Sequence, residues 1–333
     1  MPKRRIIPLF IPHAGCPNQC VFCDQKKITG AGTPVTPEQV RADIAKSLPT
    51  AGTGCELAFY GGSFTAMDRS VQQGLLAAAE PFVRSGAVGR IRLSTRPDAV
   101  NRENCQLLRD YGVTTVELGC QSMDPEVLER SRRGHSPEDT VQAVGLLREY
   151  GFSVILQMMT GLPGDTGEAS VETARQLMAL QPDGVRIYPA VVLRGTELEA
   201  MMRQGVYQPQ SVEAAVTLCA ELYGMFQRAG IPVIRLGLNP TERLSAGEAL
   251  AGAYHPALGE LVLSELYRRR AEDLLVGTMP DTAVTLEVHP SRISVMVGQH
   301  RCNIQALRNY FSLKSIKVTA GARDLWEISL KKE

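Results

Sequence analysis

Three of the chain's cysteines lie within eight residues, in the order Cys16, Cys20 and Cys23. This C-x3-C-x2-C group directly follows a short apolar segment that is predicted to be a strand. Three thiolates on one short loop can ligate three irons of a cubane cluster, whereas electron-transfer [4Fe–4S] clusters normally use four cysteines. The fourth iron would keep an open coordination position, which is typical of catalytic rather than structural metal sites.

Two alternatives for this group stay open on spacing alone. His13 could complete a Cys3His structural zinc site, although such sites usually take a second ligand pair from a distant CxxC, and no second CxxC follows. The three cysteines could also be grouped by chance. The remaining cysteines are scattered singly, at Cys55, Cys105, Cys120, Cys219 and Cys302.

The composition is ordinary for a folded globular protein. Among 333 residues, 36 Lys and Arg balance 35 Asp and Glu, and 44% are hydrophobic, which excludes disorder as the main state. No apolar run approaches the ~20 residues that span a bilayer, so we expect no membrane partner. The segment Ile6–Ile11 is too short for a signal peptide and contains Pro8. We therefore expect a reducing, cytoplasmic location, where clustered cysteines more often bind metal or act in catalysis than form disulfides.

Short apolar segments alternate with helical patterns along the first 240 residues. Thr36-Pro37 and Ser136-Pro137 are typical helix starts, because a hydroxyl caps the helix and proline fits its first turn. Six β-α repeats predict a parallel sheet, either curled into a barrel or open and doubly wound. In both cases ligands bind at the C-terminal ends of the strands. The predicted strands are Arg5–Ile11, Glu56–Tyr60, Arg90–Thr95, Thr114–Gly119, Ser153–Met159 and Gly184–Pro189.

The pattern changes after Ile231–Leu238, and we place a domain boundary near residue 240. Residues 1–240 are predicted to form the larger domain, and residues 241–333 a helical linker with a small α/β domain. Glu248–Gly277 is predicted to be helical. Strands with one helix are then expected over Val284–Val288, Ile293–Val297, Asn303–Tyr310, Ser315–Val318 and Leu325–Leu330.

The cysteine loop after a first strand resembles the signature of the radical S-adenosylmethionine (SAM) superfamily. The resemblance implies a partial (β/α)6 barrel and a [4Fe–4S] cluster on Cys16, Cys20 and Cys23. It also implies that SAM chelates the open iron and is cleaved, on reduction by a low-potential electron donor, to a 5′-deoxyadenosyl radical that abstracts hydrogen. The protein would hold the cluster potential and exclude water from the radical.

Further residues match SAM-binding positions of this family. Phe22 stands where the family has an aromatic residue near the adenine, and Gly61-Gly62-Ser63 resembles the glycine motif that binds the SAM amino group. Ser94 falls where relatives often carry a ribose-binding glutamate. Arg132 and His135 are expected either to face the substrate or to be polar residues at a helix entry. The cofactor-binding residues implied are Phe22, Gly61, Gly62, Ser63, Ser94, Gln121, Arg133 and Gln157.

The order of the strings TRPD, VELGCQS, RRGH, GLPGD and IYP…RGT closely resembles the radical-SAM domain of the Elongator catalytic subunit, over about residues 6–240. That family modifies the wobble uridine of tRNA with acetyl-CoA as the carbon source. In that family the first and second cysteines of the motif are farther apart in sequence than Cys16 and Cys20. The 93 residues after 240 look too short for its acetyltransferase domain. We therefore expect RNA, most specifically tRNA, as substrate without the acetyl-CoA chemistry. An enzyme resembling anaerobic coproporphyrinogen oxidase, acting on a small molecule, is the alternative.

The C-terminal segment resembles a KH module, in which a glycine loop before a helix holds backbone nucleotides. Gly298 fits the first loop glycine, and Arg301 replaces the second. From residue 289 onward, eight Lys and Arg against three acids give a net charge of 8 − 3 = +5. A small cap over the barrel, or a non-catalytic RNA-binding protein with a structural metal loop, remains the alternative. The residues expected to contact tRNA are Arg292, Arg301, Arg308, Lys314 and Lys317.

Overall fold

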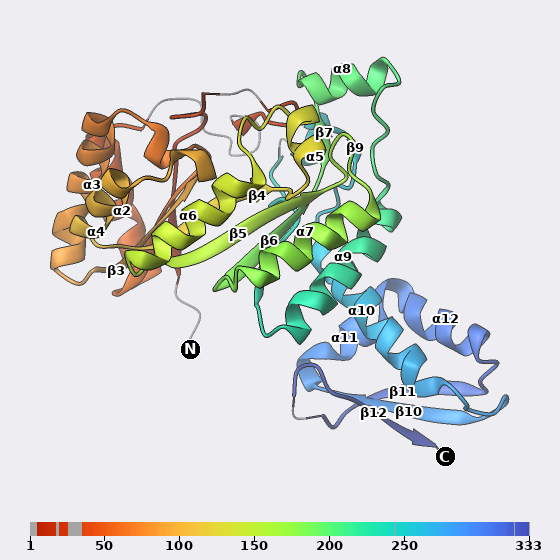
Figure 1. Cartoon of the computed structure of the whole chain (residues 1–333). Helices are drawn as coiled ribbons and strands as arrows, with labels where there is room; N and C mark the ends of the chain where they lie inside the picture. The colour runs from red at the N-terminus through yellow and green to blue at the C-terminus, as the bar shows by residue number, and fades with distance from the viewer. Residues whose placement is uncertain (1–4, 18–19, 26–34, 243, 323, 333) are drawn as a thin grey trace. The chain divides into compact units, whose positions relative to one another are not determined.

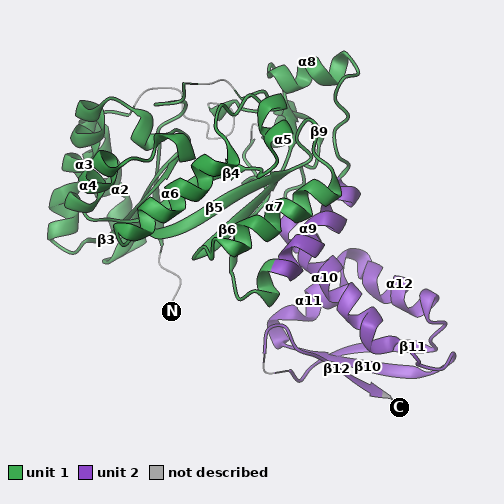
Figure 2. Ribbon diagram, in the orientation of Figure 1, with its two compact units in different colours: residues 1–211, 226–256 green, residues 212–225, 257–333 purple. Residues whose placement is uncertain are grey.

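The computed structural model describes the chain except residues 1–4, 18–19, 26–34, 243, 323 and 333 (Figure 1). The chain forms two compact units (Figure 2), residues 1–211 with 226–256, and residues 212–225 with 257–333. Residue 240 therefore lies inside the larger unit, and helix α9 (Val212–Arg228) contributes to both units. Within the described residues, no helix is long and apolar enough to span a membrane.

The larger unit is built on a seven-stranded parallel sheet in the order β1-β2-β3-β4-β5-β6-β8. The strand order follows the chain order, so every crossover advances in one direction, as in a barrel; a doubly wound sheet would reverse direction. The partial barrel is confirmed, with a seventh strand added to the six predicted ones. The strands are β1 (Ile6–Phe10), β2 (Cys55–Tyr60), β3 (Val88–Thr95), β4 (Val113–Gln121), β5 (Ser153–Thr160), β6 (Gly184–Pro189) and β8 (Val233–Leu236).

Helices connect these strands and cover the outer face of the sheet, as α6 and α7 do over β5 and β6 (Figure 1). Both predicted helix starts are confirmed. Thr36 accepts a hydrogen bond from the Gln39 amide, and Ser136 forms a reciprocal capping box with Asp139. The connecting helices are α2 (Pro37–Ala51), α3 (Arg69–Arg84), α4 (Arg102–Asp110), α5 (Pro125–Arg130), α6 (Pro137–Glu149), α7 (Gly167–Ala179) and α8 (Glu197–Arg203).

The start of the cysteine loop packs backbone to backbone on the loop after β2. The Ile11 amide donates to the Tyr60 carbonyl at 2.7 Å, and the Ser63 amide donates to the Ala14 carbonyl at 2.8 Å. Gly62 permits this approach, because a Cβ there would lie 2.5 Å from the Ile11 oxygen and 2.7 Å from the Ala14 oxygen. The second loop therefore serves as the base on which the first is folded.

The smaller unit is a three-stranded mixed sheet covered by helices. Strand β10 (Ala283–Val288) pairs parallel with β11 (Ser315–Ala320) and antiparallel with β12 (Ile328–Lys332). Its core joins strand residues such as Leu286 to residues of all three helices. These three helices are α10 (Leu258–Leu275), α11 (Ile293–Val297) and α12 (Cys302–Tyr310), and residues 212–225 of α9 also belong to the unit.

Two predicted elements were wrong. Ile293–Val297 alternates like a strand but forms α11, because the neighbours Val295 and Met296 are both buried and packing overrides β propensity. The helix predicted over Glu248–Gly277 begins only at Leu258, because Gly252 at φ 90° ends a short strand, β9 (Ala249–Gly252), that pairs with β7 (Val191–Leu193).

The close contact between the cysteine loop and the loop after β2 can be tested by adding one methyl group at Gly62. We expect Gly62→Ala to destabilise the chain by about 1–3 kcal/mol, since the new Cβ must displace two carbonyl oxygens. The measurement is the free energy of unfolding in urea. Gly145→Ala in α6 is the matched control, because nothing lies within 4 Å of its Cβ position, and it should stabilise by up to about 1 kcal/mol. Equal effects of the two substitutions on the free energy of unfolding would contradict the proposed contact at Gly62.

Candidate active site

One cavity of about 1270 Å³ opens among the C-terminal ends of the strands and the cysteine loop. It exceeds the roughly 300–1,000 Å³ of most small-ligand sites, so it has room for a cofactor and part of a substrate. All three clustered cysteines line it, together with seven of the eight expected cofactor-binding residues: Phe22, Gly61, Gly62, Ser94, Gln121, Arg133 and Gln157.

Ser63 is the expected residue that does not line this cavity. Its side chain is buried, and its hydroxyl lies 3.0 Å from Thr95 Oγ1 and accepts a hydrogen bond from the Arg96 amide at 3.2 Å. Ser63 thus ties the loop after β2 to the end of β3, one strand farther along the sheet.

Arg133 connects the cysteine loop to the barrel. Its Nη1 donates to Cys20 Sγ at 3.2 Å, and its Nη2 donates to the Gly119 carbonyl at 2.6 Å. Buried Arg96 donates to the Arg133 carbonyl at 2.5 Å and forms a bidentate pair with Asp98 at 2.9 Å. The Arg96–Asp98 pair is therefore a local salt bridge that holds the backbone behind a cation of the site.

The three thiols form no disulfide. Burial, with the neighbouring Cys20 and Cys16, raises the pKa of the Cys23 thiol to about 12. Within the described part of the chain, no group of three or more Cys, His, Asp or Glu side chains converges on a single metal ion. His13 Nε2 accepts a hydrogen bond from the Gln25 amide at 2.9 Å. In this structure the Nε2 acceptor of His13, which a Cys3His zinc site could use, is therefore engaged by a backbone amide.

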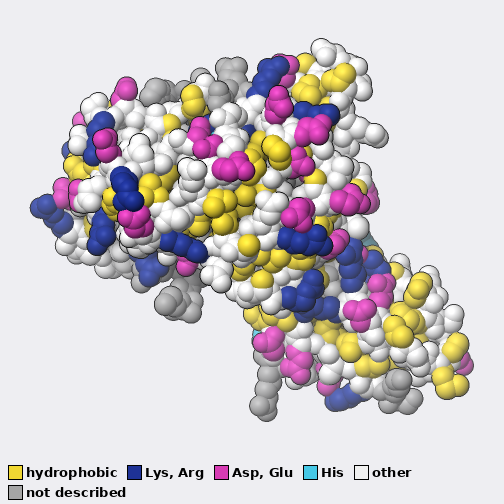
Figure 3. Space-filling view, viewed as in Figure 1, with side chains coloured by type: hydrophobic (Ala, Val, Ile, Leu, Met, Phe, Trp, Pro, Cys, Tyr) yellow, Lys and Arg dark blue, Asp and Glu magenta, His cyan; other side chains and the backbone are white. Residues whose placement is uncertain are grey.

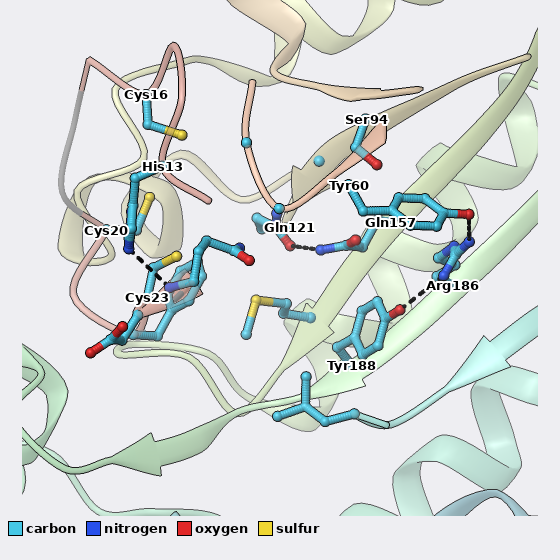
Figure 4. Close-up of a pocket in the computed structure, with 18 of the residues that line it drawn as sticks. His13, Cys16, Cys20, Cys23, Tyr60, Ser94, Gln121, Gln157, Arg186 and Tyr188 are labelled. Carbon is cyan, nitrogen blue, oxygen red and sulfur yellow. Dashed lines mark hydrogen bonds between the residues drawn. The ribbon is translucent and has the colours of Figure 1, made fainter. Parts of the chain in front are cut away.

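Gln121 and Gln157 form a pair of amides in the middle of the cavity (Figure 4). Gln157 Nε2 donates to Gln121 Oε1 at 3.2 Å. Gln121 has φ 66° at an irregularity in the β4–β5 pairing, and such bulges reorient side chains next to active sites. Gly119, which the sequence analysis did not single out, leaves the space: a Cβ there would lie 2.9 Å from Gln121 Nε2.

Arg132 and His135, expected to have similar roles, have different positions. Arg132 lines the cavity and its guanidinium lies 3.4 Å from the Glu197 carboxylate. His135 is buried outside the cavity lining, with Nε2 3.1 Å from the Cys120 carbonyl oxygen, and burial together with the Arg133 charge lowers its pKa to about 4. His135 is therefore a neutral packing residue at neutral pH.

A group of charged side chains on the strands belongs to none of the sequence motifs described above. Glu117 accepts hydrogen bonds from Arg92 and Arg186 at 2.8 and 2.7 Å, and these supply the polar partners that a glutamate within a strand requires. Tyr60 donates to the same Glu117 oxygen at 3.3 Å. The signal was present in the sequence, because strands of a fully covered parallel sheet are normally apolar throughout, and inward charges mark an open interior.

Comparison with known proteins agrees with this geometry. The sequence model of the radical SAM superfamily matches residues 10–177, and that of the radical SAM C-terminal domain matches residues 182–268. A tRNA uridine(34) acetyltransferase of Dehalococcoides mccartyi is 28% identical over 243 residues, which are 62% of this chain and 53% of the relative. The corresponding enzyme of Methanocaldococcus infernus is 37% identical over 127 residues, 37% of this chain and 24% of the relative. The chain thus spans about half the length, or less, of these curated relatives.

Two solved structures share the fold. Elp3 of Methanocaldococcus infernus, with an N-terminal deletion, has a TM-score of 0.63 at 24% identity, covering 80% of this chain and 63% of its own. Coproporphyrinogen III oxidase from Escherichia coli has a TM-score of 0.50 at 19% identity, covering 69% and 54%. Since the superfamily model alone matches half of the sequence, this chain belongs to the radical SAM superfamily and is a radical SAM enzyme.

Proposed function

We propose that the chain binds a [4Fe–4S] cluster through Cys16, Cys20 and Cys23, binds SAM in the adjoining cavity, and modifies RNA, with tRNA as the substrate. The observation that carries the proposal is the opening of all three thiols into the cavity that contains the glycine loop and the two glutamines. When bound, the cluster and SAM supply a radical that abstracts hydrogen. The membership of this chain in the radical SAM superfamily implies both the cluster and SAM.

The residues around the thiols have chemistry that suits these groups. Arg133 places a fixed cation beside Cys20 Sγ, where it can stabilise thiolate charge and receive the SAM carboxylate. The absence of side chains at Gly61 and Gly62 leaves backbone polar groups accessible at the cavity wall. The amides of Gln121 and Gln157 can hydrogen-bond ribose hydroxyls. Phe22 packs against Val127 and Leu162, as an aromatic wall for the adenine would.

RNA as the substrate is supported by the relatives named for tRNA uridine(34) and by the smaller unit. The segment 298–301 connects α11 to α12, and Gly298, His300 and Arg301 all have positive φ, between 50° and 76°. This loop before a helix has the position of the phosphate-holding loop in KH modules. Four of the five expected contact residues are exposed: Arg301, Arg308, Lys314 and Lys317.

Arg292, the fifth, has a different environment: its guanidinium lies over the Trp326 ring at 5.5 Å.

In the larger unit, Lys and Arg are interspersed with Asp and Glu over the visible face (Figure 3). Attraction for RNA would therefore come from local basic groups rather than from a field of one sign.

Anaerobic reconstitution with iron and sulfide tests the cluster assignment. We expect about four irons per chain and SAM-dependent release of 5′-deoxyadenosine. Replacing Cys16, Cys20 or Cys23 by Ala should abolish this release. The matched controls Cys55→Ala, Cys105→Ala and Cys219→Ala, all at buried cysteines, should retain it. Turnover in Cys20→Ala, or stoichiometric zinc without turnover, would refute the assignment.

Salt titration of tRNA binding tests the RNA assignment. We expect Arg301→Ala to reduce the slope of log K against log salt by about 0.7–0.9, the loss of one phosphate contact. Lys331→Ala is the matched control, because its ammonium already pairs with Glu287 at 2.7 Å, and its slope should match the wild type. Lys317→Ala tests β11 separately. Binding that is absent or independent of salt would favour a small-molecule substrate.

A further inference from the structure

The barrel interior contains a wall of charged side chains on the side of the cavity away from the cysteines. In Figure 4, the Gln121–Gln157 pair lies between the three cysteines and the Arg186–Tyr188 group. Four charged residues of the barrel interior pair with one another, and two of them, Glu117 and Arg186, also line the cavity. Arg92 bridges Glu56 at 3.0 Å and Glu117 at 2.8 Å, and Arg186 pairs with Glu117 at 2.7 Å. Two arginines and two glutamates thus neutralise each other.

Arg235 is the additional cation of this wall. It lines the cavity from β8, the last strand of the sheet, and its Nε donates to the Gly237 carbonyl at 3.0 Å. Its terminal nitrogens have no hydrogen-bond or ion-pair partner in the part of the chain that the structure describes. Arg235 is the register partner of Arg186 on the neighbouring parallel strand β6. Within the described residues Arg186 has a carboxylate partner in Glu117 and Arg235 has none, so the second guanidinium is available to an anion.

The strand register places Arg235 beside the expected SAM site. Gly119, Gln157, Arg186 and Arg235 occupy successive partner positions on β4, β5, β6 and β8. Neighbouring strands lie roughly 4.8 Å apart, so Arg235 lies two strands, about 10 Å, from Gln157. A molecule that contacts SAM near Gln157 can therefore reach Arg235 with its other end.

We propose that Arg235, with Arg186 beside it, is the binding site for an oxyanion of the substrate, a phosphate or a carboxylate. The planar guanidinium offers parallel N–H donors that match either oxyanion. Tyr188, whose hydroxyl accepts from Arg186 Nη1 at 3.2 Å, provides a further hydroxyl at the cavity wall. The proposal rests on the proposed function for the position of SAM, but the charge balance around Arg235 does not depend on it.

Arginine modification by phenylglyoxal tests the site without any turnover. In the full-length chain at constant ionic strength, modification is followed at each arginine by peptide mass spectrometry, with and without inorganic phosphate or acetate. We expect phosphate or acetate to slow modification of Arg235 by roughly tenfold. Stronger protection by phosphate would identify a nucleotide-type oxyanion, and stronger protection by acetate a carboxylate. Arg90, an exposed strand arginine outside the cavity lining, is the internal control and should react at an unchanged rate.

Equal protection of Arg235 and Arg90, or of neither, would overturn the proposal. A second measurement separates it from the proposed function. Arg235→Gln should leave the dissociation constant of SAM within about twofold of wild type. In Arg235→Lys, the same anion should still protect Arg186 from phenylglyoxal, but more weakly than in the wild type. A loss of SAM affinity in Arg235→Gln would assign this arginine to the cofactor site instead. Failure of reconstitution alone would refute the proposed function but not the oxyanion site.

Discussion

The geometry of the active site depends on a contact in which no side chain takes part. Carbonyl oxygens of the cysteine loop lie directly against the Cα of Gly62, and amides from each loop donate to carbonyls of the other. Hydrogen bonds between main chains leave little rotational freedom, so the thiols start from a fixed backbone. Gly15 is subject to the same constraint, since a Cβ there would lie 2.3 Å from the Ser63 oxygen.

The parallel sheet converts this local contact into a site. Because the strands run in one direction and in chain order, Gly62 after β2, Gln121 at the end of β4 and Gln157 within β5 line one cavity. The interior below them is polar, with carboxylates and guanidiniums on adjacent strands. Such pairs cost desolvation energy, and their mutual hydrogen bonds offset much of it. The open barrel therefore contains paired charges where a closed barrel would contain packed aliphatic side chains.

Much of this architecture was predictable from sequence, for physical reasons. Each of the six predicted strands is an apolar segment between turn residues, and helix caps such as Ser136 act locally, so both leave a direct signal. The charged residues within the strands are visible in the sequence, but their pairing is not, because Arg92 and Glu117 meet only through the strand register. The burial of Ser63 outside the cavity was not predictable either, because it depends on which side of the loop after β2 faces the cavity. Short elements such as β7 and α11 are fixed by their tertiary neighbours rather than by their own pattern.

Helix α9 has a consequence for dissecting the chain. Its residues 212–225 belong to the smaller unit, where the Tyr223 ring packs at a tilt of 51° against Trp326, with ring centroids 5.5 Å apart. The chain therefore enters the smaller unit, returns to the larger one for residues 226–256, and enters the smaller one again. No single peptide bond separates the two folds, so a fragment that begins at residue 257 would lack an aromatic partner of its own core. A circular permutation or a discontinuous graft, rather than simple truncation, is the route to each unit in isolation.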